Sequence, residues 1–258
     1  MTRPLILLFL LLVATLHSTA QIRLPGYRQA DVDHRLYARW KARWISLKGE
    51  PGNVYGVYHF RKTFTLESKP RRFIVHVSAD NRYKLYCNGR RVSLGPARCD
   101  TYNWNFETVD LAPYLSAGRN VLAAEVWNFA DLRPAAQMTL GQTGFLLQGN
   151  TENEDLVNTD TSWCAIRNDA YKPWQGPRVV STYFSGPGEY IDGSRYPWGW
   201  QQPDYDDSAW KPVSTALTGA MKDTRNYRGR MLVPRPIPPM ESTLQRFATI
   251  RIAEGAKV

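Results

Sequence analysis

Five carboxylates late in the chain are the side chains whose types and spacing could support chemistry. They are Glu189, Asp192, Asp204, Asp206 and Asp207, the last three within the segment PDYDDSAW. Two carboxylates that face each other across a tryptophan-lined cleft could act as a general acid and a general base. Aspartates in such loops also commonly accept hydrogen bonds within turns. We favour the turn interpretation and predict no catalytic residue in this chain.

The same aspartates raise the question of a metal site. Asp204 and Asp206, together with backbone carbonyls, could bind a calcium ion, because hard cations prefer oxygen ligands. The four histidines are scattered, and no CxxC or HExxH motif is present, so no zinc site is predicted. Turn formation again explains the aspartates better. We therefore predict no metal ion and no cofactor.

Aromatic side chains in polar loops form a second group with a chemical use. Sugar rings stack their apolar faces on aromatic rings, and a few polar groups fix their orientation. The residues that fit this pattern are Asn103, Trp104, Asn105, Trp198 and Trp200. They predict carbohydrate contact through exposed loops. The favoured alternative is that these tryptophans are buried against a neighbouring domain.

The stretch Ser78–Pro96 predicts the element around which the fold is organised. Tyr83, Leu85 and Cys87 alternate with Lys84 and Tyr86, which is the period of a strand with one buried face. Asn88-Gly89 follows at once, and this pair is typical of a tight type I′ hairpin turn. A β-hairpin within an antiparallel sandwich is therefore expected here.

Other segments with strand patterns flank this hairpin. They are Tyr58–Leu66, Phe73–Val77, Val121–Trp127, Gly144–Gln148 and Trp163–Ile166. A helical turn is expected at Leu111–Leu115, and Trp40 and Trp44 stand four apart, as in another helical turn. Short strands separated by turn residues predict an all-β fold, an antiparallel β-sandwich of the jelly-roll, galactose-binding-domain-like kind, over residues 21–170.

The composition changes after residue 170. Pro, Gly and aromatic residues become frequent and periodic patterns rare, as in PWQGP, SGPGEY and PRPIPP. Residues 171–258 are therefore expected to form an irregular linker or accessory segment and the start of a following β domain. The strand-like run Phe247–Ile252 ends this part, and we expect more chain to follow.

Residues 1–20 have the pattern of an export signal. Arg3 precedes the apolar run Leu5–Ala14, and Ser18-Thr19-Ala20 fits cleavage before Gln21. The run is too short for a typical membrane span, although an uncleaved anchor is the alternative. We expect an exported protein, periplasmic or extracellular, with no membrane span after cleavage.

The charge and the cysteine content indicate whether a nucleic-acid partner or a disulfide is expected. The formal net charge is +10, but the basic residues are spread along the chain and interleaved with strands, so a nucleic-acid partner is not expected. Three cysteines leave at least one unpaired. Cys87 and Cys99 could form a disulfide, but the apolar register of Cys87 favours a buried thiol.

Several motifs in order resemble the N-terminal region of bacterial α-L-rhamnosidases. They are YHFRKTFTL, SADNRYKLYCNG, GPAR, ETVDLAPYLSAGRNVLAAEVWNF, TGFLLQG, PWGWQQPDYDDSAW and RPIPPMES. The resemblance covers nearly all of the chain after the signal. The cysteines at 87 and 99 depart from it, where aliphatic and small residues are usual. It implies a sugar-binding-type jelly roll that precedes a catalytic domain.

The resemblance also implies where catalysis resides in such enzymes. It implies an (α/α)6 barrel downstream that carries an acidic general acid and an acidic general base for inverting glycoside hydrolysis. Residues 1–258 lack the repeated long amphipathic helices of such a barrel. No catalytic residue of the family can therefore be assigned to this sequence.

The sequence thus predicts the N-terminal β-sandwich fragment of an α-L-rhamnosidase-like glycoside hydrolase. It would brace a catalytic barrel absent from this chain, contact glycan as an additional role, and be inactive alone. Its partners would be that barrel and, through the full enzyme, a rhamnose-containing glycan or glycoside. A free-standing carbohydrate-binding module without catalysis is the alternative. A sandwich from another glycoside hydrolase family, such as a β-galactosidase-like enzyme, is a third.

Overall fold

The structure is a computed structural model that describes residues 32–174, 183, 188–225, 229–243 and 248–249. The predicted export signal at residues 1–20 lies outside these residues, as does most of the strand-like run Phe247–Ile252. None of the helices within the described ranges is long and apolar enough to cross a membrane.

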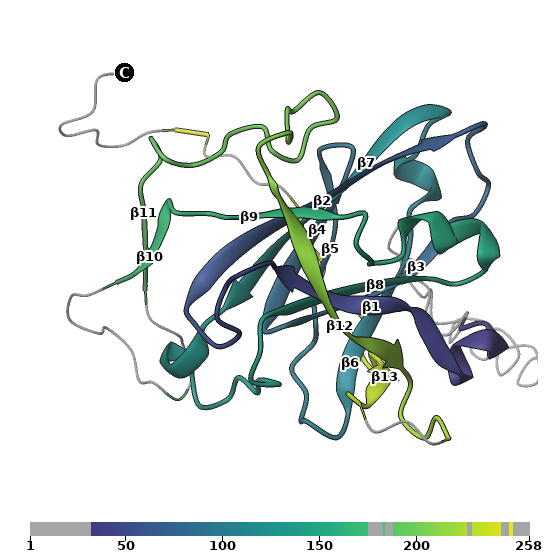
Figure 1. Cartoon of the computed structure of the whole chain (residues 1–258), viewed down its shortest axis with the longest axis horizontal. Coiled ribbons are helices and arrows are strands. Elements are labelled where there is room, and N and C mark those ends of the chain that lie inside the picture. The colour runs from purple at the N-terminus through teal and green to yellow at the C-terminus, as the bar shows by residue number, and fades with distance from the viewer. Residues whose placement is uncertain (1–31, 175–182, 184–187, 226–228, 244–247, 250–258) are drawn as a thin grey trace, which may run out of the picture.

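Eleven strands form one curled sheet (Figure 1). Its order is β13-β6-β3-β8-β1-β12-β9-β2-β7-β4-β5, and β10 and β11 form a separate two-stranded sheet. The strands of the large sheet are β1 (Arg39–Leu47), β2 (Gly56–Leu66), β3 (Ile74–Asp80), β4 (Arg82–Cys87), β5 (Arg90–Gly95), β6 (Trp104–Asp110), β7 (Gly118–Asn128), β8 (Gly144–Gly149), β9 (Cys164–Arg167), β12 (Lys211–Ala220) and β13 (Leu232–Pro234).

The remaining elements are short. The small sheet consists of β10 (Tyr171–Pro173) and β11 (Glu189–Ile191). The four helical segments are single 3-10 turns or little more: η1 (His34–Tyr37), η2 (Ala112–Tyr114), η3 (Ala130–Leu132) and η4 (Glu152–Val157). The turn η2 is the one predicted at Leu111–Leu115. The all-β, mostly antiparallel fold expected from the sequence is confirmed.

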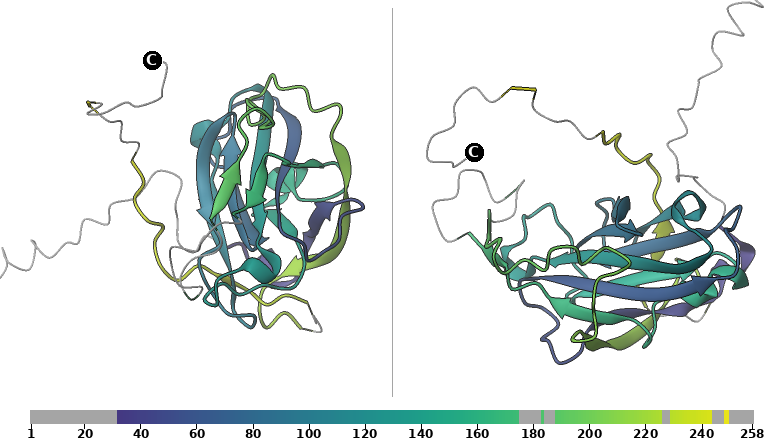
Figure 2. Two further views of the ribbon diagram at one scale, coloured as in Figure 1. Left: turned by 90° about the vertical axis from the view of Figure 1, so that its left-hand side faces the viewer. Right: turned by 90° about the horizontal axis from the view of Figure 1, so that it is seen from above.

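The curled sheet makes two layers that enclose the main core (Figure 2). Phe60 of β2 and Phe145 of β8 stack across this core with ring centres 5.7 Å apart, and Trp163 meets Phe145 edge-on at 5.6 Å. Alternate residues of β3, β4 and β7 complete the same cluster. Burial of this apolar surface is the main force that holds the layers together.

The organising hairpin is present as predicted. β4 and β5 pair from Tyr83↔Gly95 to Cys87↔Arg90. Asn88 and Gly89 between them have φ of 49° and 78°, the left-handed values that a type I′ turn requires. The Asn88 side chain donates to the Tyr114 carbonyl at 2.9 Å, which ties the turn to η2.

The central strand β7 is buried on both faces, as its apolar sequence predicts. Leu122, Ala124 and Val126 lie in the main core. Val121 and Ala123 face the other way and pack under Trp200 and Trp210. A strand of this kind needs cover on its outer side, and the segment around the two tryptophans supplies it.

The helical turn expected around Trp40 and Trp44 is wrong. Both side chains are buried on one face of β1, while Lys41 and Arg43 between them are exposed. A spacing of four residues fits a strand as well as a helix, because strand side chains repeat every two residues. Ala42, also buried, completes the period-two pattern.

Strands from beyond residue 170 belong to the same sheet. β12 pairs with β1 over Val213–Ala220 and with β9 through Lys211 and Pro212, so it bridges the two layers. β13 pairs with β6 in parallel. The expected division at residue 170 therefore does not separate these strands from the sandwich, and any further β domain stays a prediction.

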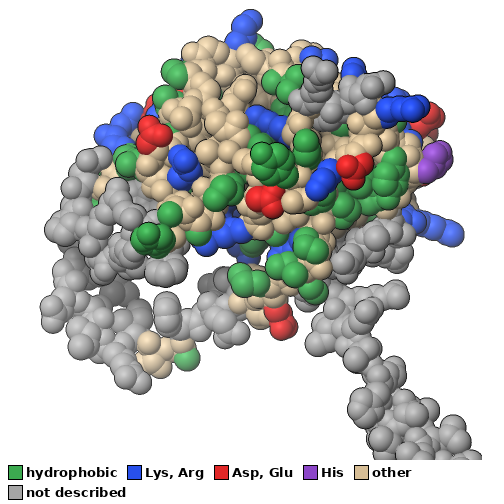
Figure 3. All heavy atoms as spheres, turned by 90° about the horizontal axis from the view of Figure 1, so that it is seen from below, with side chains coloured by type: hydrophobic (Ala, Val, Ile, Leu, Met, Phe, Trp, Pro, Cys, Tyr) green, Lys and Arg blue, Asp and Glu red, His purple; other side chains and the backbone are tan. Residues whose placement is uncertain are grey.

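The sequence predicts a buried thiol at Cys87 and basic residues that are spread along the chain. All three cysteines are free, and Cys87 is buried, which raises the pKa of its thiol to about 12. Figure 3 shows one face of the molecule, where basic, acidic and hydrophobic side chains are interspersed.

Candidate functional site

The outer face of strands β2, β7 and β4 carries an unusual set of side chains. Aromatic and charged residues replace the small polar ones that face water on most antiparallel sheets. They are His59 and Arg61 on β2, Glu125 and Trp127 on β7, and Lys84 and Tyr86 on β4. The segment 193–210 crosses this face and covers part of it.

Arg61 fastens the covering segment to the sheet. Its side chain is 0% exposed and its Nε donates to Asp207 Oδ2 at 2.8 Å. The guanidinium also donates to the backbone carbonyls of Trp200 and of Gln202, the latter at 3.1 Å. Tyr205 lies beside it, with its ring centre 5.4 Å from the guanidinium carbon. Asp207 thus neutralises a buried cation, a structural role.

Asp204 is exposed, whereas Asp192 and Asp206 are engaged within the fold. Asp206 Oδ1 accepts from the Ser208 backbone N–H at 3.0 Å, and Asp192 Oδ1 accepts from Ser194 N–H at 3.0 Å. Both are turn contacts of the kind expected from the sequence. No group of three His, Cys, Asp or Glu side chains suited to a metal occurs in the part of the chain that the structure covers.

His59 and Trp200 form the floor of the covered region. Their rings stack with centres 3.8 Å apart and an interplanar angle of 18°. Burial lowers the pKa of His59 to about 3, and the charge of Lys84 adds to this effect. The imidazole is therefore neutral near pH 7 and acts as a flat packing surface.

A row of four aromatic rings runs outward from β7. Trp127, Tyr171, Tyr196 and Trp198 follow one another with ring centres 6.3, 6.2 and 4.7 Å apart. Trp127 is buried, the two tyrosines are half-buried, and Trp198 is 72% exposed. We call these four residues the aromatic row.

Polar groups line the inner end of the aromatic row. Trp127 Nε1 donates to Glu189 Oε1 at 2.9 Å, and the Tyr171 hydroxyl donates to Glu125 Oε1 at 3.1 Å. Lys84 Nζ lies 4.4 Å from the centre of the Trp127 ring, a cation–π contact. Burial raises the pKa of both carboxyls, while the positive charge of Lys84 partly opposes it.

The structure separates the five residues predicted to contact carbohydrate. Trp104 is buried with Trp40 and Phe106, and Trp200 is 1% exposed under the covering segment. Asn105 is buried too, so the exposure expected for these three is wrong. Trp104 and Asn105 belong to β6, and Trp200 packs on β7. The composition of the loops alone does not predict this burial.

The remaining two differ in what they contact. Asn103 donates from Nδ2 to Asp100 and accepts from Lys222 Nζ at 2.7 Å, so its amide is used within the fold. Trp198 keeps an exposed ring. The sequence analysis did not identify Trp127 and Tyr171 as part of the same aromatic row as Trp198. The one local indication was Glu125, the single charged residue in the apolar run Val121–Trp127.

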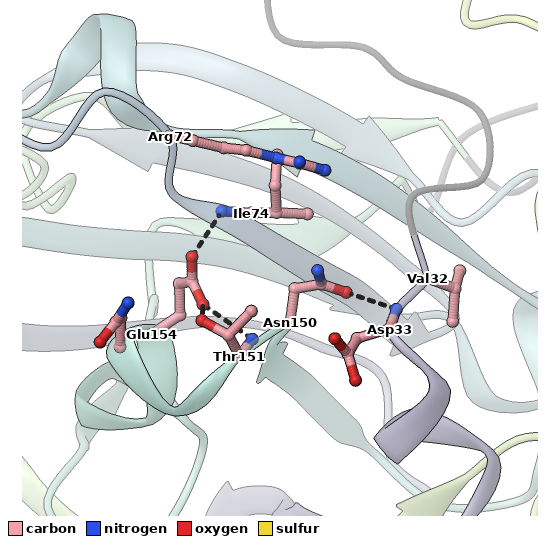
Figure 4. A pocket seen from close by; sticks show the side chains of 8 residues that line it. Val32, Asp33, Arg72, Ile74, Asn150, Thr151 and Glu154 are labelled. Carbon is pink, nitrogen blue, oxygen red and sulfur yellow. Dashed lines mark hydrogen bonds between the residues drawn. The ribbon is translucent and has the colours of Figure 1, made fainter.

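A hollow of about 450 Å³ lies elsewhere, between η1, the start of β3 and η4. Figure 4 shows its lining residues, most of whose polar groups bond to one another. Glu154 accepts from the Ile74 and Thr151 backbone N–H groups at 3.3 and 2.7 Å. Asn150 Oδ1 accepts from Asp33 N–H at 2.9 Å. These bonds hold the loops together, and we assign the hollow no binding role.

Comparison with known proteins identifies related sequences. Residues 68–242 match the family model described as the alpha-L-rhamnosidase N-terminal domain. An alpha-L-rhamnosidase of Alteromonas sp. (strain LOR) is 29% identical over 199 residues, which are 68% of this chain and 20% of that protein. One from Streptomyces avermitilis is 23% identical over 201 residues, 69% of this chain and 16% of that protein.

Solved structures show the same relationship. A GH78 family rhamnosidase of Bacillus sp. GL1 superposes with a TM-score of 0.64 and 26% identity, over 78% of this chain and 20% of that one. An α-L-rhamnosidase from Dictyoglumus thermophilum shares the fold, with a TM-score of 0.56, 22% identity, and coverage of 78% and 23%. The chain thus spans about a fifth of the length of these relatives. Since the family model matches more than half of it, the chain belongs to the alpha-L-rhamnosidase N-terminal domain family.

Proposed function

We propose that this chain is a non-catalytic domain that works together with a catalytic domain in an α-L-rhamnosidase-like glycoside hydrolase. The match to residues 68–242 carries the proposal, because it extends over the sandwich from β3 to β13. The relatives that share this region bear the name alpha-L-rhamnosidase. Through such an enzyme the chain would serve the release of rhamnose from glycans or glycosides.

The bonding of the carboxylates supports a role without catalysis. Inverting hydrolysis needs two carboxyls about 6.5–9.5 Å apart that face each other across open space for sugar and water. Asp207 is tied to Arg61, Asp206 and Asp192 are tied to turn N–H groups, and Glu189 accepts from Trp127. These four carboxylates are thus engaged in contacts within the fold, while Asp204 is exposed.

Support of a catalytic domain is the role we assign to the sandwich. Its strands are rigidly paired, and Ile237 and Met240 after β13 are 56% and 82% exposed. Exposed apolar side chains of this kind commonly lie at interfaces. Export is proposed as well, from the pattern of residues 1–20.

Turnover of an aryl α-L-rhamnoside by the purified chain tests the absence of catalysis. We expect no release of the aryl group above the buffer rate at any pH between 4 and 8. Release that saturates with substrate and scales with protein concentration would overturn the proposal. Reading the coding DNA beyond the codon for Val258 tests the partnership, and we expect an in-frame continuation that encodes helical repeats.

A free-standing carbohydrate-binding module is the second candidate. The exposed ring of Trp198 beside Tyr196 favours it, because the apolar faces of sugars stack on such rings. A stop codon followed by unrelated sequence, together with a stable monomer that binds glycan, would favour this candidate over the first.

A further inference from the structure

Trp198 stands at the corner of a tight turn. The Trp200 N–H donates to the Pro197 carbonyl at 3.2 Å, and Gly199 has φ of +80°. These are features of a type II β-turn, in which the third residue must be able to adopt positive φ. Trp198 is the second residue of this turn. The backbone therefore projects its side chain away from the protein body.

The indole ring is held in place although it is exposed. Its Nε1–H donates to the Gly193 carbonyl at 2.8 Å, and the Tyr196 ring lies 4.7 Å away. A Cβ on Gly193 would come within 3.9 Å of the indole, so the loop backbone lies close beneath it. The ring thus loses little additional freedom when it meets a ligand, which favours binding.

Trp200, two residues later, is the tryptophan that packs this segment onto the sheet. Trp200 is 1% exposed, stacks on His59 and meets Tyr86 at 5.4 Å. It supplies the packing that attaches the segment to β7. Trp198 is mostly exposed and packs little against the core. Its indole N–H bonds to the Gly193 carbonyl. Its ring is therefore fixed by the loop and remains accessible to a ligand.

The rest of the aromatic row indicates the chemical class of that ligand. Successive rings lie 4.7–6.3 Å apart. Glu125 and Trp127 at the inner end are buried, so the polar groups that border the accessible part of the row are the exposed Glu189 and the half-buried Lys84. Ring faces suit the C–H faces of sugars, and charged groups of both signs suit hydroxyls, which donate and accept.

We propose that the aromatic row is a glycan-binding site, with Trp198 as its stacking platform, and that it takes an extended oligosaccharide and not a single terminal sugar. The accessible part of the row, from Trp198 through Tyr196 to Tyr171, is longer than one sugar ring, so one sugar on Trp198 leaves Tyr171 and Glu189 to its neighbours. That the glycan contains rhamnose rests on the proposed function. The location of the site rests on the geometry of the aromatic row alone.

Titration of the whole chain with defined sugars tests the site. The probes are L-rhamnose, a soluble oligosaccharide that contains α-L-rhamnose, and a β-1,4-linked glucose oligosaccharide, followed by tryptophan fluorescence and calorimetry. We expect the rhamnose-containing oligosaccharide to bind at least tenfold more tightly than the monosaccharide. Trp198→Ala should weaken this binding at least tenfold, and Trp198→Phe should retain most of it.

Tyr102→Ala is the matched control. Tyr102 is 68% exposed, close to the 72% of Trp198, but it lies in the turn before β6 and outside the aromatic row. Equal binding by the Trp198→Ala variant and the unaltered chain, or no binding of any probe, overturns the site. Equal affinity for the glucose and rhamnose oligosaccharides supports the site and counts against the rhamnose substrate of the proposed function.

Discussion

Arg235, directly after β13, reaches across the sheet edge to Glu107 of β6, with its Nη1 3.4 Å from Glu107 Oε1 in a region closed to water. The same carboxylate accepts from the Tyr83 hydroxyl at 3.0 Å and from the Ala97 N–H at 2.8 Å. Arg235 in turn donates to the Ile237 and Pro238 carbonyls. This pair fixes the last described strand to the sandwich.

Arg235→Leu should destabilise the fold strongly above pH 7, where Glu107 is ionised, because it leaves a buried carboxylate without its cation. Removal of one partner of a buried pair costs about 3–5 kcal/mol. The double variant Arg235→Leu, Glu107→Gln should recover part of this loss, since the amide carries no charge. Urea unfolding of the three proteins measures the free energies. A double variant less stable than Arg235→Leu would contradict the pairing.

Glu107 should also make stability depend on pH. Burial raises the pKa of its carboxyl from 4.5 to about 7, although the hydrogen bonds and Arg235 oppose this. The folded protein therefore holds a proton on Glu107 that the unfolded chain releases above pH 4.5. This contribution is greatest at low pH and is lost as the pH rises toward 7, by roughly 3 kcal/mol in total.

The difference in stability between the unaltered chain and Glu107→Gln isolates this effect. His59 and His76 have pKa values lowered by burial to about 3 and about 4, so they act in the opposite direction and destabilise the fold as the pH falls below 6.5. Both proteins share that loss. A stability difference that does not vary between pH 4.5 and 7 would contradict the raised pKa of Glu107.

Gly89→Ala should destabilise the hairpin for two separate reasons. Gly89 has φ of +78°, and a Cβ there would overlap the side-chain amide of Gln202. Strained positions of this kind cost about 1–3 kcal/mol. Gln202→Ala added to Gly89→Ala should restore the part due to the clash, leaving the backbone part. Thermal melting of the single and double variants measures both.

Trp200→Ala and Trp198→Ala should differ sharply in stability. Truncation of the buried Trp200 leaves a cavity over β7, with a cost of about 3–5 kcal/mol. Truncation of the exposed Trp198 should change stability by less than about 0.5 kcal/mol. Chemical unfolding of both variants checks this. Equal losses would mean that Trp198 also serves packing and would weaken its assignment as a binding platform.

The sequence predicts those parts of the fold that depend on local patterns. The hairpin at Asn88-Gly89 and the apolar strand Val121–Trp127 need only neighbours in the chain to be recognised. β12 has the sequence KPVSTALTGA, which lacks a regular apolar alternation, because its two ends pair with different strands in different layers. Such a strand is defined by its partners and not by its own residues.

The candidate site was predictable to a smaller extent. The Gly- and Asn-rich loops predict exposed rings at Trp104, Trp198 and Trp200 alike, but Trp104 and Trp200 are buried. Whether a loop tryptophan is covered depends on where a distant strand places it. Tyr171 and Glu189 meet Glu125 and Trp127 across 46 and 62 residues of sequence, beyond the reach of any local pattern.

The position of β12 has a consequence for the order in which the molecule can form. β1 begins at residue 39, yet its long partner is β12, and its single pairing with β8 joins Ile45 to Phe145. During synthesis, the first strand of the sandwich must therefore wait until residue 220 has emerged. Contacts this distant along the chain slow folding. Until then β1 presents an open strand edge, which a chaperone or a second copy of the chain could occupy.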